Sequence, residues 1–227
     1  MSLAMLRRAL SRPGFLSMVT HRRFVLCLHD VSDPSDSAHS PLYSTTPDHL
    51  RRHIDRLSPF LDWVPLERIL SPEPPGRRPI AAITFDDGFR SVKDVATPIL
   101  DAVGIPFAIF VCKLAAERNF LPITTRHLIG KNPVWRERFS DLLPVATKGY
   151  GFIQPRLDED LIARIDEVEM AGVLKERVYL LPEEIRSLHS RGVSVGSHSV
   201  THRVLQTLKA EARGNAAGDQ SEQVAGV

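Results

Sequence analysis

The sequence has little of what marks secreted, membrane-spanning or nucleic-acid-binding proteins. Its 227 residues include two cysteines, Cys27 and Cys112, which are too few for a disulfide framework in a chain of this length. The net charge is only +2, so composition gives no case for a nucleic-acid partner. In the basic N-terminal stretch, Arg7, Arg8 and Arg12 interrupt the apolar run that a secretory signal needs.

These absences set expectations about location and partners. We expect no signal peptide, no stable membrane insertion and a cytoplasmic location. An organellar transit peptide, which is also Arg-rich and free of acids, stays an alternative. Both cysteines lie in apolar runs, FVLCL and FAIFVC, so we expect two buried thiols. The oligomeric state is left open.

The sequence does contain the alternation of strands and helices that is typical of an α/β fold. Short apolar runs predict buried strands at 24–28, 80–85, 105–112 and 193–199. Apolar periodicity with capping residues predicts helices at 46–61, 91–104, 181–192 and 201–208. Continuous apolar runs such as IAAITF are typical of a parallel sheet covered on both faces.

The length fits one domain with extensions at its ends. We expect a basic N-terminal extension over 1–23 and one domain over 24–208. Over 209–227 small and polar residues replace the apolar pattern, so we expect a disordered tail. Residues 113–180 contain helix-like pieces but no pattern that we can connect to chemistry.

Two adjacent carboxylates follow the predicted strand 80–85. In the motif TFDDG, Asp86 and Asp87 precede Gly88. Ligands of open α/β sheets bind beyond the carboxyl ends of the strands. The glycine permits a turn after which both carboxylates can face one cavity. One could then coordinate a metal ion while the other acts as general base; the alternative is a local Asp-Gly turn.

A pair of histidines lies where the strand 193–199 ends. In GSHSVTH, His198 and His202 are four residues apart, so on a helical turn they would share one face and could bind one ion. Two histidines and one aspartate match the three protein ligands of a catalytic zinc site, whose fourth position is open to water. The alternative is a pair of solvated or capping histidines.

Together, TFDDG and the later HSVTH resemble the polysaccharide deacetylase family, also called the NodB-homology or carbohydrate esterase family 4 group. Four further segments resemble that family: FVLCLHDV, TPDHLRRHIDRL, PILDAVGIPFAIFV and LPEEIRSLHSRGVSVGSHSVTHRVL. The resemblance spans residues 24–208, with a poor match over 113–180.

The resemblance implies an α/β fold of the distorted (β/α) barrel type and hydrolysis of acetyl groups from an N- or O-acetylated polysaccharide or oligosaccharide. It implies Asp87, His198 and His202 as ligands of a divalent metal, with zinc first and cobalt, nickel or manganese as alternatives. Asp86 would be the general base that takes a proton from the attacking water. The expected partner is an acetylated glycan.

Other features leave alternatives open. His29 and Asp30 end the first predicted strand, where they either line the site or only begin a loop. The family's later motifs, including its catalytic-acid histidine, have no counterpart after Leu208, so we expect a barrel that is incomplete at its C-terminus, with open strand edges. His189 is one hypothesis for a substitute acid. The alternative function is a catalytically impaired metal- or carbohydrate-binding remnant. A metal-dependent amidohydrolase unrelated to sugars would normally show an early H-x-H pair, which the sequence lacks.

Overall fold

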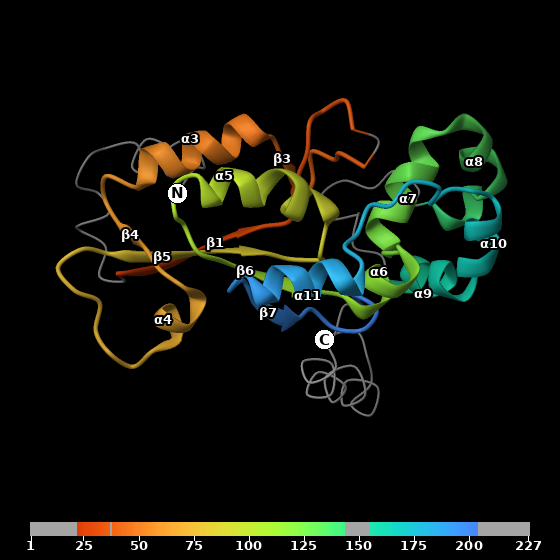
Figure 1. The fold of residues 1–227 in the computed structure, drawn as a ribbon. Helices are drawn as coiled ribbons and strands as arrows, with labels where there is room; N and C mark the ends of the chain where they lie inside the picture. The colour runs from red at the N-terminus through yellow and green to blue at the C-terminus, as the bar shows by residue number, and fades with distance from the viewer. Residues whose placement is uncertain (1–21, 37, 144–154, 204–227) are drawn as a thin grey trace.

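The protein is described by a computed structural model over residues 22–36, 38–143 and 155–203 (Figure 1). Its main sheet has the strand order β1-β5-β6-β7, with β4 beside the start of β5, and every pairing is parallel. The strands are β1 (Arg23–Leu28), β4 (Asp62–Trp63), β5 (Ile80–Phe85), β6 (Phe107–Val111) and β7 (Ser194–Ser197). A second, two-stranded sheet joins β2 (Asp30–Val31) to β3 (Ser44–Thr45). The predicted α/β class with a parallel sheet is confirmed.

One face of the sheet is covered by helices. These are α3 (Pro47–Leu57), the short π-helical turn η1 (Val92–Ala96), α5 (Thr97–Asp101) and α11 (Pro182–Ser190). Ile83, Phe85 and Ile109 on this face are fully buried in the main core. Helix α3 begins as the sequence predicts, because the Thr46 side chain accepts a hydrogen bond from the backbone N–H of His49 at 3.2 Å.

The opposite face of the sheet is less covered. Helix α4 (Leu66–Leu70) lies over its N-terminal end, where the Ser194 hydroxyl donates to Glu67 at 2.7 Å. Further along β1, Val25 is 48% exposed and Cys27 is exposed. The expectation of two buried thiols is therefore correct for Cys112 and wrong for Cys27. The cause is alternation along the strand: Cys27 points to this open face, whereas Leu26 and Leu28 pack against the core.

Residues 113–143 and 155–174 form a helical insertion between β6 and α11, with a second core. Its elements are α6 (Lys113–Arg118), α7 (Pro122–Lys131), α8 (Pro133–Arg138), η2 (Ser140–Leu142), α9 (Pro155–Ala163) and α10 (Ile165–Met170). The core contains Phe120, Ile129, Phe139 and Leu161, each with no exposed surface. Figure 1 shows the insertion as a separate layer at one end of the sheet. The sequence did not predict it.

Two expected helices differ from the structure. The segment 91–104 begins as a π-helical turn and continues as α5, which ends at Asp101. The segment 201–208 is not helical over its described residues 201–203, and its remainder lies outside the described residues. Of the predicted extension over 1–23, residues 1–21 lie outside the described residues and Arg23 already begins β1, while the tail at 209–227 lies outside them entirely.

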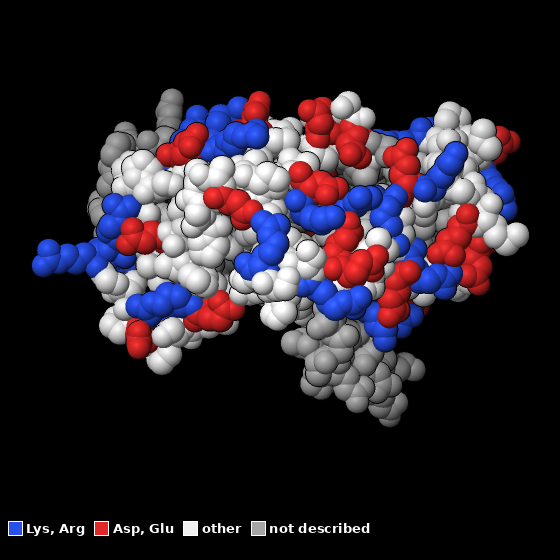
Figure 2. Space-filling view, in the orientation of Figure 1, with Lys and Arg blue, Asp and Glu red and all other residues white. Residues whose placement is uncertain are grey.

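The described surface is mixed in charge. Figure 2 shows lysine and arginine side chains interspersed with aspartate and glutamate over the face that includes α11 and the insertion. Many of these charges form pairs, for example Arg118 with Glu169 at 2.8 Å and Arg164 with Asp141 at 2.6 Å. Across the described ranges, no helix has both the length and the apolar character required to cross a membrane.

Candidate metal centre

The structure brings together three side chains that the sequence singles out. Asp87 lies just beyond the end of β5, and His198 and His202 lie beyond the end of β7. One ligand atom from each of the three lies within 4.8 Å of those of the other two. The two strands are not neighbours, since β6 lies between them, so the cluster depends on the sheet order.

Oδ1 of Asp87 is the centre of this cluster. It lies 3.5 Å from Nε2 of His198 and 3.2 Å from Nε2 of His202. Three ligands that bind one zinc ion tetrahedrally, each about 2.1 Å from it, would be roughly 3.4 Å apart. The spacing of both histidines from the carboxylate therefore fits a shared cation.

Oδ1 of Asp87 is also buried without a hydrogen-bond partner. The residue is 2% exposed, whereas each histidine side chain is 32% exposed. A buried carboxylate oxygen without a hydrogen-bond partner is costly, because it has lost its hydration. A bound cation would remove that cost, so the residues present fit a metal ion.

The three groups also shift one another's protonation. Burial raises the pKa of the Asp87 carboxyl, but His202, His29 and His198 outweigh it and hold the pKa below its ordinary value. Burial lowers the pKa of His202, and Asp87 outweighs this to raise it. For His198, burial is the dominant effect and keeps the pKa below its ordinary value. A carboxylate and a neutral imidazole are the forms that bind metal.

The histidine pair is not carried by a helical turn, in contrast to the expectation from its spacing. Residues 198–203 contain no helix, and Ser199 and His202 have φ values of 71° and 56° in the left-handed region. The Ser199 hydroxyl accepts a hydrogen bond from the backbone N–H of His202 at 3.0 Å. The loop turns back on itself in this way, and the two rings lie with centroids 5.1 Å apart.

Backbone hydrogen bonds fix this loop to the elements beside it. The N–H of His198 donates to the carbonyl of Val111 at 2.9 Å. The N–H of Leu114, in the first turn of α6, donates to the carbonyl of Val200 at 2.9 Å. The buried thiol of Cys112 donates to the carbonyl of His198 at 2.9 Å. The end of β6 and the start of the insertion together position both histidines.

The loop that carries Asp87 is packed more tightly. Asp87 and Gly88 both have positive φ, at 71° and 79°. A Cβ on Gly88 would lie 2.9 Å from a methyl group of Val111, so no larger residue fits there without a shift. Phe89 is 1% exposed and packs on the buried ring of Tyr179, with centroids 4.9 Å apart.

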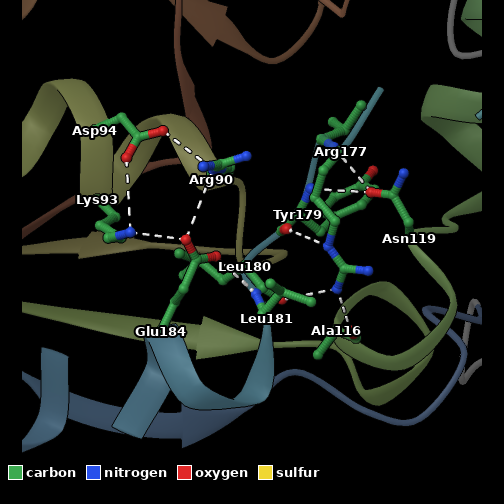
Figure 3. A network of polar contacts seen from close by, with 11 residues as sticks. Arg90, Lys93, Asp94, Ala116, Asn119, Arg177, Tyr179, Leu180, Leu181 and Glu184 are labelled. Atoms are coloured by element: carbon green, nitrogen blue, oxygen red, sulfur yellow. Dashed lines mark hydrogen bonds and ion pairs between the residues drawn. The ribbon is translucent and has the colours of Figure 1, made fainter. Parts of the chain in front are cut away.

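A polar network supports this loop through the segment that precedes α11 (Figure 3). Asn119 Oδ1 accepts from the N–H groups of Val178 and Tyr179 at 2.8 and 3.2 Å. Glu184 accepts from the backbone of Leu181 at 2.9 Å and from Lys93 at 2.7 Å. The network joins the insertion, η1 and α11, and so holds the segment against which Phe89 packs.

Asp86, the predicted general base, is next to Asp87 and half-buried. Its backbone N–H donates to the carbonyl of Leu28 at 2.9 Å. Its Oδ2 accepts a hydrogen bond from the thiol of Cys27 at 3.2 Å. The sequence reasoning missed this contact; period-2 alternation along 24–29, which places Cys27 on the same face as His29, could have indicated it.

His29 and Asp30 have different surroundings. His29 is half-buried and close enough to influence the protonation of Asp87 and His198. Asp30 is 2% exposed, and its oxygens accept hydrogen bonds from three hydroxyl groups. These are Ser91 at 2.6 Å, Ser44 at 2.5 Å and Ser32. Asp30 therefore holds Ser32 and Ser44 close to Ser91, while a role in lining the site stays a prediction for both His29 and Asp30.

The hypothesis that His189 acts as a substitute acid does not fit the geometry. His189 is in the last turn of α11, and its Nδ1 lies 3.3 Å from the carbonyl of Val193. Val193 precedes β7, whereas His198 follows it. At about 3.3 Å per strand residue, the length of β7 separates His189 from the metal centre. It cannot reach a leaving group bound there.

Known proteins match this chain in family and in fold. The sequence model of the family described as polysaccharide deacetylase matches residues 73–224. No curated protein matches the sequence.

Three solved structures are similar. The Streptococcus pyogenes deacetylase PplD in complex with acetate has 14% identity and a TM-score of 0.53, over 91% of this chain and 68% of that one. A de-N-acetylase from Aggregatibacter actinomycetemcomitans has 20% identity and a TM-score of 0.45, over 78% and 54%. A polysaccharide deacetylase from Bacillus cereus has 13% identity and a TM-score of 0.49, over 89% and 46%. The first likeness shows the fold, which is the predicted (β/α) barrel type.

Proposed function

We propose that this chain, which belongs to the polysaccharide deacetylase family, hydrolyses acetyl groups of an acetylated polysaccharide or oligosaccharide with the help of a divalent metal ion. The chain spans 68% and 54% of the first two similar structures, so the activity of the whole protein is part of the proposal. The observation that carries the metal dependence is the orphaned, buried Oδ1 of Asp87 between two imidazole nitrogens.

Asp87, His198 and His202 would hold the ion. Two imidazoles and one carboxylate form the three-ligand set of catalytic zinc sites, so zinc is our first choice, with cobalt, nickel or manganese as alternatives. When bound, a divalent ion lowers the pKa of a water molecule and polarises the acetyl carbonyl. All three ligands lie at the carboxyl ends of parallel strands, where α/β folds bind their ligands.

Asp86 would take the proton from the attacking water. It is the neighbour of Asp87 in the chain, and it is more accessible than Asp87, which is 2% exposed. A general base must be within hydrogen-bond reach of the water and must be ionised at working pH. The two carboxylates would thus have different roles: Asp87 would bind the cation and Asp86 would accept the proton.

The alternative function is a catalytically impaired metal- or carbohydrate-binding protein. The observation that favours it is the open face of the sheet, on which Val25 and Cys27 are exposed within the described residues. Electrostatic interactions are weaker in a site that stays open to solvent than in an enclosed one, which would favour binding without turnover. In this alternative the cation would bind, but no acetate would be released.

The deciding experiment is acetate release from a panel of N- and O-acetylated glycans. Purified protein is assayed with added Zn²⁺ or Co²⁺ and with a chelator as control. We expect release that requires the metal and stops with the chelator. Folded protein that binds metal but releases no acetate from any substrate would support the alternative, and release that survives the chelator would contradict the metal dependence.

A further inference from the structure

Cys27 lies on the open face of the sheet, beside Thr84, which is two residues before Asp86. The register pairs Cys27 with Thr84 on β5, so the next residues on the same face are His29 and Asp86. Cys27 is exposed, in contrast to the buried Cys112. The thiol therefore faces the same space as the candidate base rather than the hydrophobic core.

The contact between the two side chains is direct. The Cys27 Sγ donates a hydrogen bond to Oδ2 of Asp86 at 3.2 Å. A thiol held at Oδ2 restricts rotation of the carboxylate about its side-chain bonds and leaves the proton-accepting role to Oδ1.

We propose that Cys27 is a positioning residue for Asp86: its thiol donates a hydrogen bond that orients the carboxylate toward the water it is to deprotonate. This inference rests on the proposed function, in which Asp86 is the general base. The protonated thiol is the form that donates. Burial and then Asp86 itself raise the pKa of Cys27 to about 11, so the thiol keeps its proton near neutral pH.

The first test compares three substitutions of Cys27 that keep or remove its hydrogen-bond donor. Cys27→Val keeps a side chain of similar size that suits a strand but removes the donor, and Cys27→Ala removes both donor and volume. Cys27→Ser keeps a donor. We expect Val and Ala to lower kcat by roughly tenfold to a hundredfold through misorientation of the base, with KM and zinc affinity little changed. Cys27→Ser should recover most of kcat.

The matched control is Val25→Ala on the same face of β1, two residues away and 48% exposed. It should leave kcat unchanged. A kcat that falls equally in Cys27→Ser and Cys27→Val would show that the donor is irrelevant and would overturn the proposal. An unchanged kcat in Cys27→Val would also overturn it.

The second test needs no catalytic activity. Cys27 is the exposed thiol and Cys112 is buried, so a disulfide reagent such as DTNB should label Cys27 first, at a rate that its raised pKa keeps slow. We expect Asp86→Asn to speed this labelling several-fold, because the variant removes the negative charge that disfavours the thiolate. Val25→Ala should label at the wild-type rate.

The two tests separate the possible failures. If Asp86→Asn leaves the labelling rate unchanged, the contact between Cys27 and Asp86 does not exist and the proposal fails whatever the activity. If labelling responds but the wild-type protein releases no acetate, the contact stands while the proposed function and the positioning role of Cys27 both fail. If both respond as expected, the positioning role is supported.

Discussion

Every candidate ligand of the metal centre follows a strand of the main sheet, whereas the helical insertion supplies none from its described residues. The insertion acts on the site indirectly. Its first turn holds the histidine loop through Leu114, and Glu159 on α9 pairs with Arg203 at 3.7 Å, next to His202. The sheet thus carries the candidate ligands and the insertion supports the loop that holds two of them, each region with its own core.

The largest effect should come from the sheet side. Asp86→Asn removes the proposed base but none of the proposed metal ligands, so turnover should fall by about 10²–10⁴-fold with zinc affinity retained. Acetate release and zinc titration of the same preparation measure the two quantities. Asp55→Asn on the exposed side of α3 is the matched control. Loss of zinc from Asp86→Asn as severe as from a histidine variant would contradict the division of roles between Asp86 and Asp87.

The next largest effect should come from a substitution in the core of the insertion. Phe139 has no exposed surface, and the guanidinium groups of Arg138 and Arg164 lie 5.1 and 5.5 Å from its ring centre. Phe139→Ala should destabilise the second core by about 3–5 kcal/mol. Because the main core is separate, hydrogen exchange should accelerate in the insertion more than in β5 and β6.

The control for this variant is Phe60→Ala, since Phe60 is 38% exposed and should contribute little. Zinc affinity of Phe139→Ala should fall only modestly, through loosening of the histidine loop. Equal acceleration of exchange in both regions would show that the two cores unfold as one, and the distinction between chemistry and support would then fail.

A third change probes the ligands themselves. His198→Ala should weaken zinc binding by at least about a hundredfold, because even outer-shell partners of metal ligands contribute 10–100-fold. Isothermal titration with Zn²⁺ measures it, with His49→Ala on the exposed surface of α3 as control. Unchanged affinity would remove His198 from the ligand set.

The contrast between the main sheet and the insertion also explains which elements the sequence could predict. Strand β5 is buried along its whole length, so its continuous apolar run was sufficient to identify it. Helix α3 was predictable because cap, proline and apolar spacing agree locally. Asp86 and Asp87 were predictable as strand-end residues because they follow the apolar run of β5. The expectation of a buried strand before His198 was wrong in one respect, because β7 is only half-buried along its length. The structure brings Asp87, His198 and His202 together, while their role as ligands stays a prediction.

The insertion was not predictable because its stability is not local. Helices α6 and α8 have six residues each, too short for a periodic pattern. Arg126 and Asp158 form a buried ion pair although they are 32 residues apart in sequence. A pattern of neighbouring residues cannot indicate such a pair. The exposure of Cys27 was missed for a related reason, because the local pattern of a strand does not show which of its faces other elements cover.

The smallest effect should appear between two elements that cover the main sheet, in the network that also reaches the insertion. Glu184 on α11 is 11% exposed in its side chain and binds Lys93 of η1 (Figure 3). Burial raises its pKa, but the N–H of Leu181 and the charge of Lys93 outweigh this and lower it below the ordinary 4.5. A lowered pKa in the folded state means that the ionised glutamate stabilises the fold above the ordinary pKa. That stability is lost as the pH falls through the lower, folded-state value.

Glu184→Gln should therefore lower the free energy of unfolding at neutral pH, and the difference from wild type should shrink as the pH falls below 4.5. Urea unfolding at a series of pH values measures this difference. Asp94→Asn, in the same network but 47% exposed, should show a smaller change. If the Glu184→Gln difference is the same at every pH, the charge of Glu184 does not stabilise the contact between α11 and η1. The side chains of Asn119 and Arg177 would then be the stabilising part of the network in Figure 3.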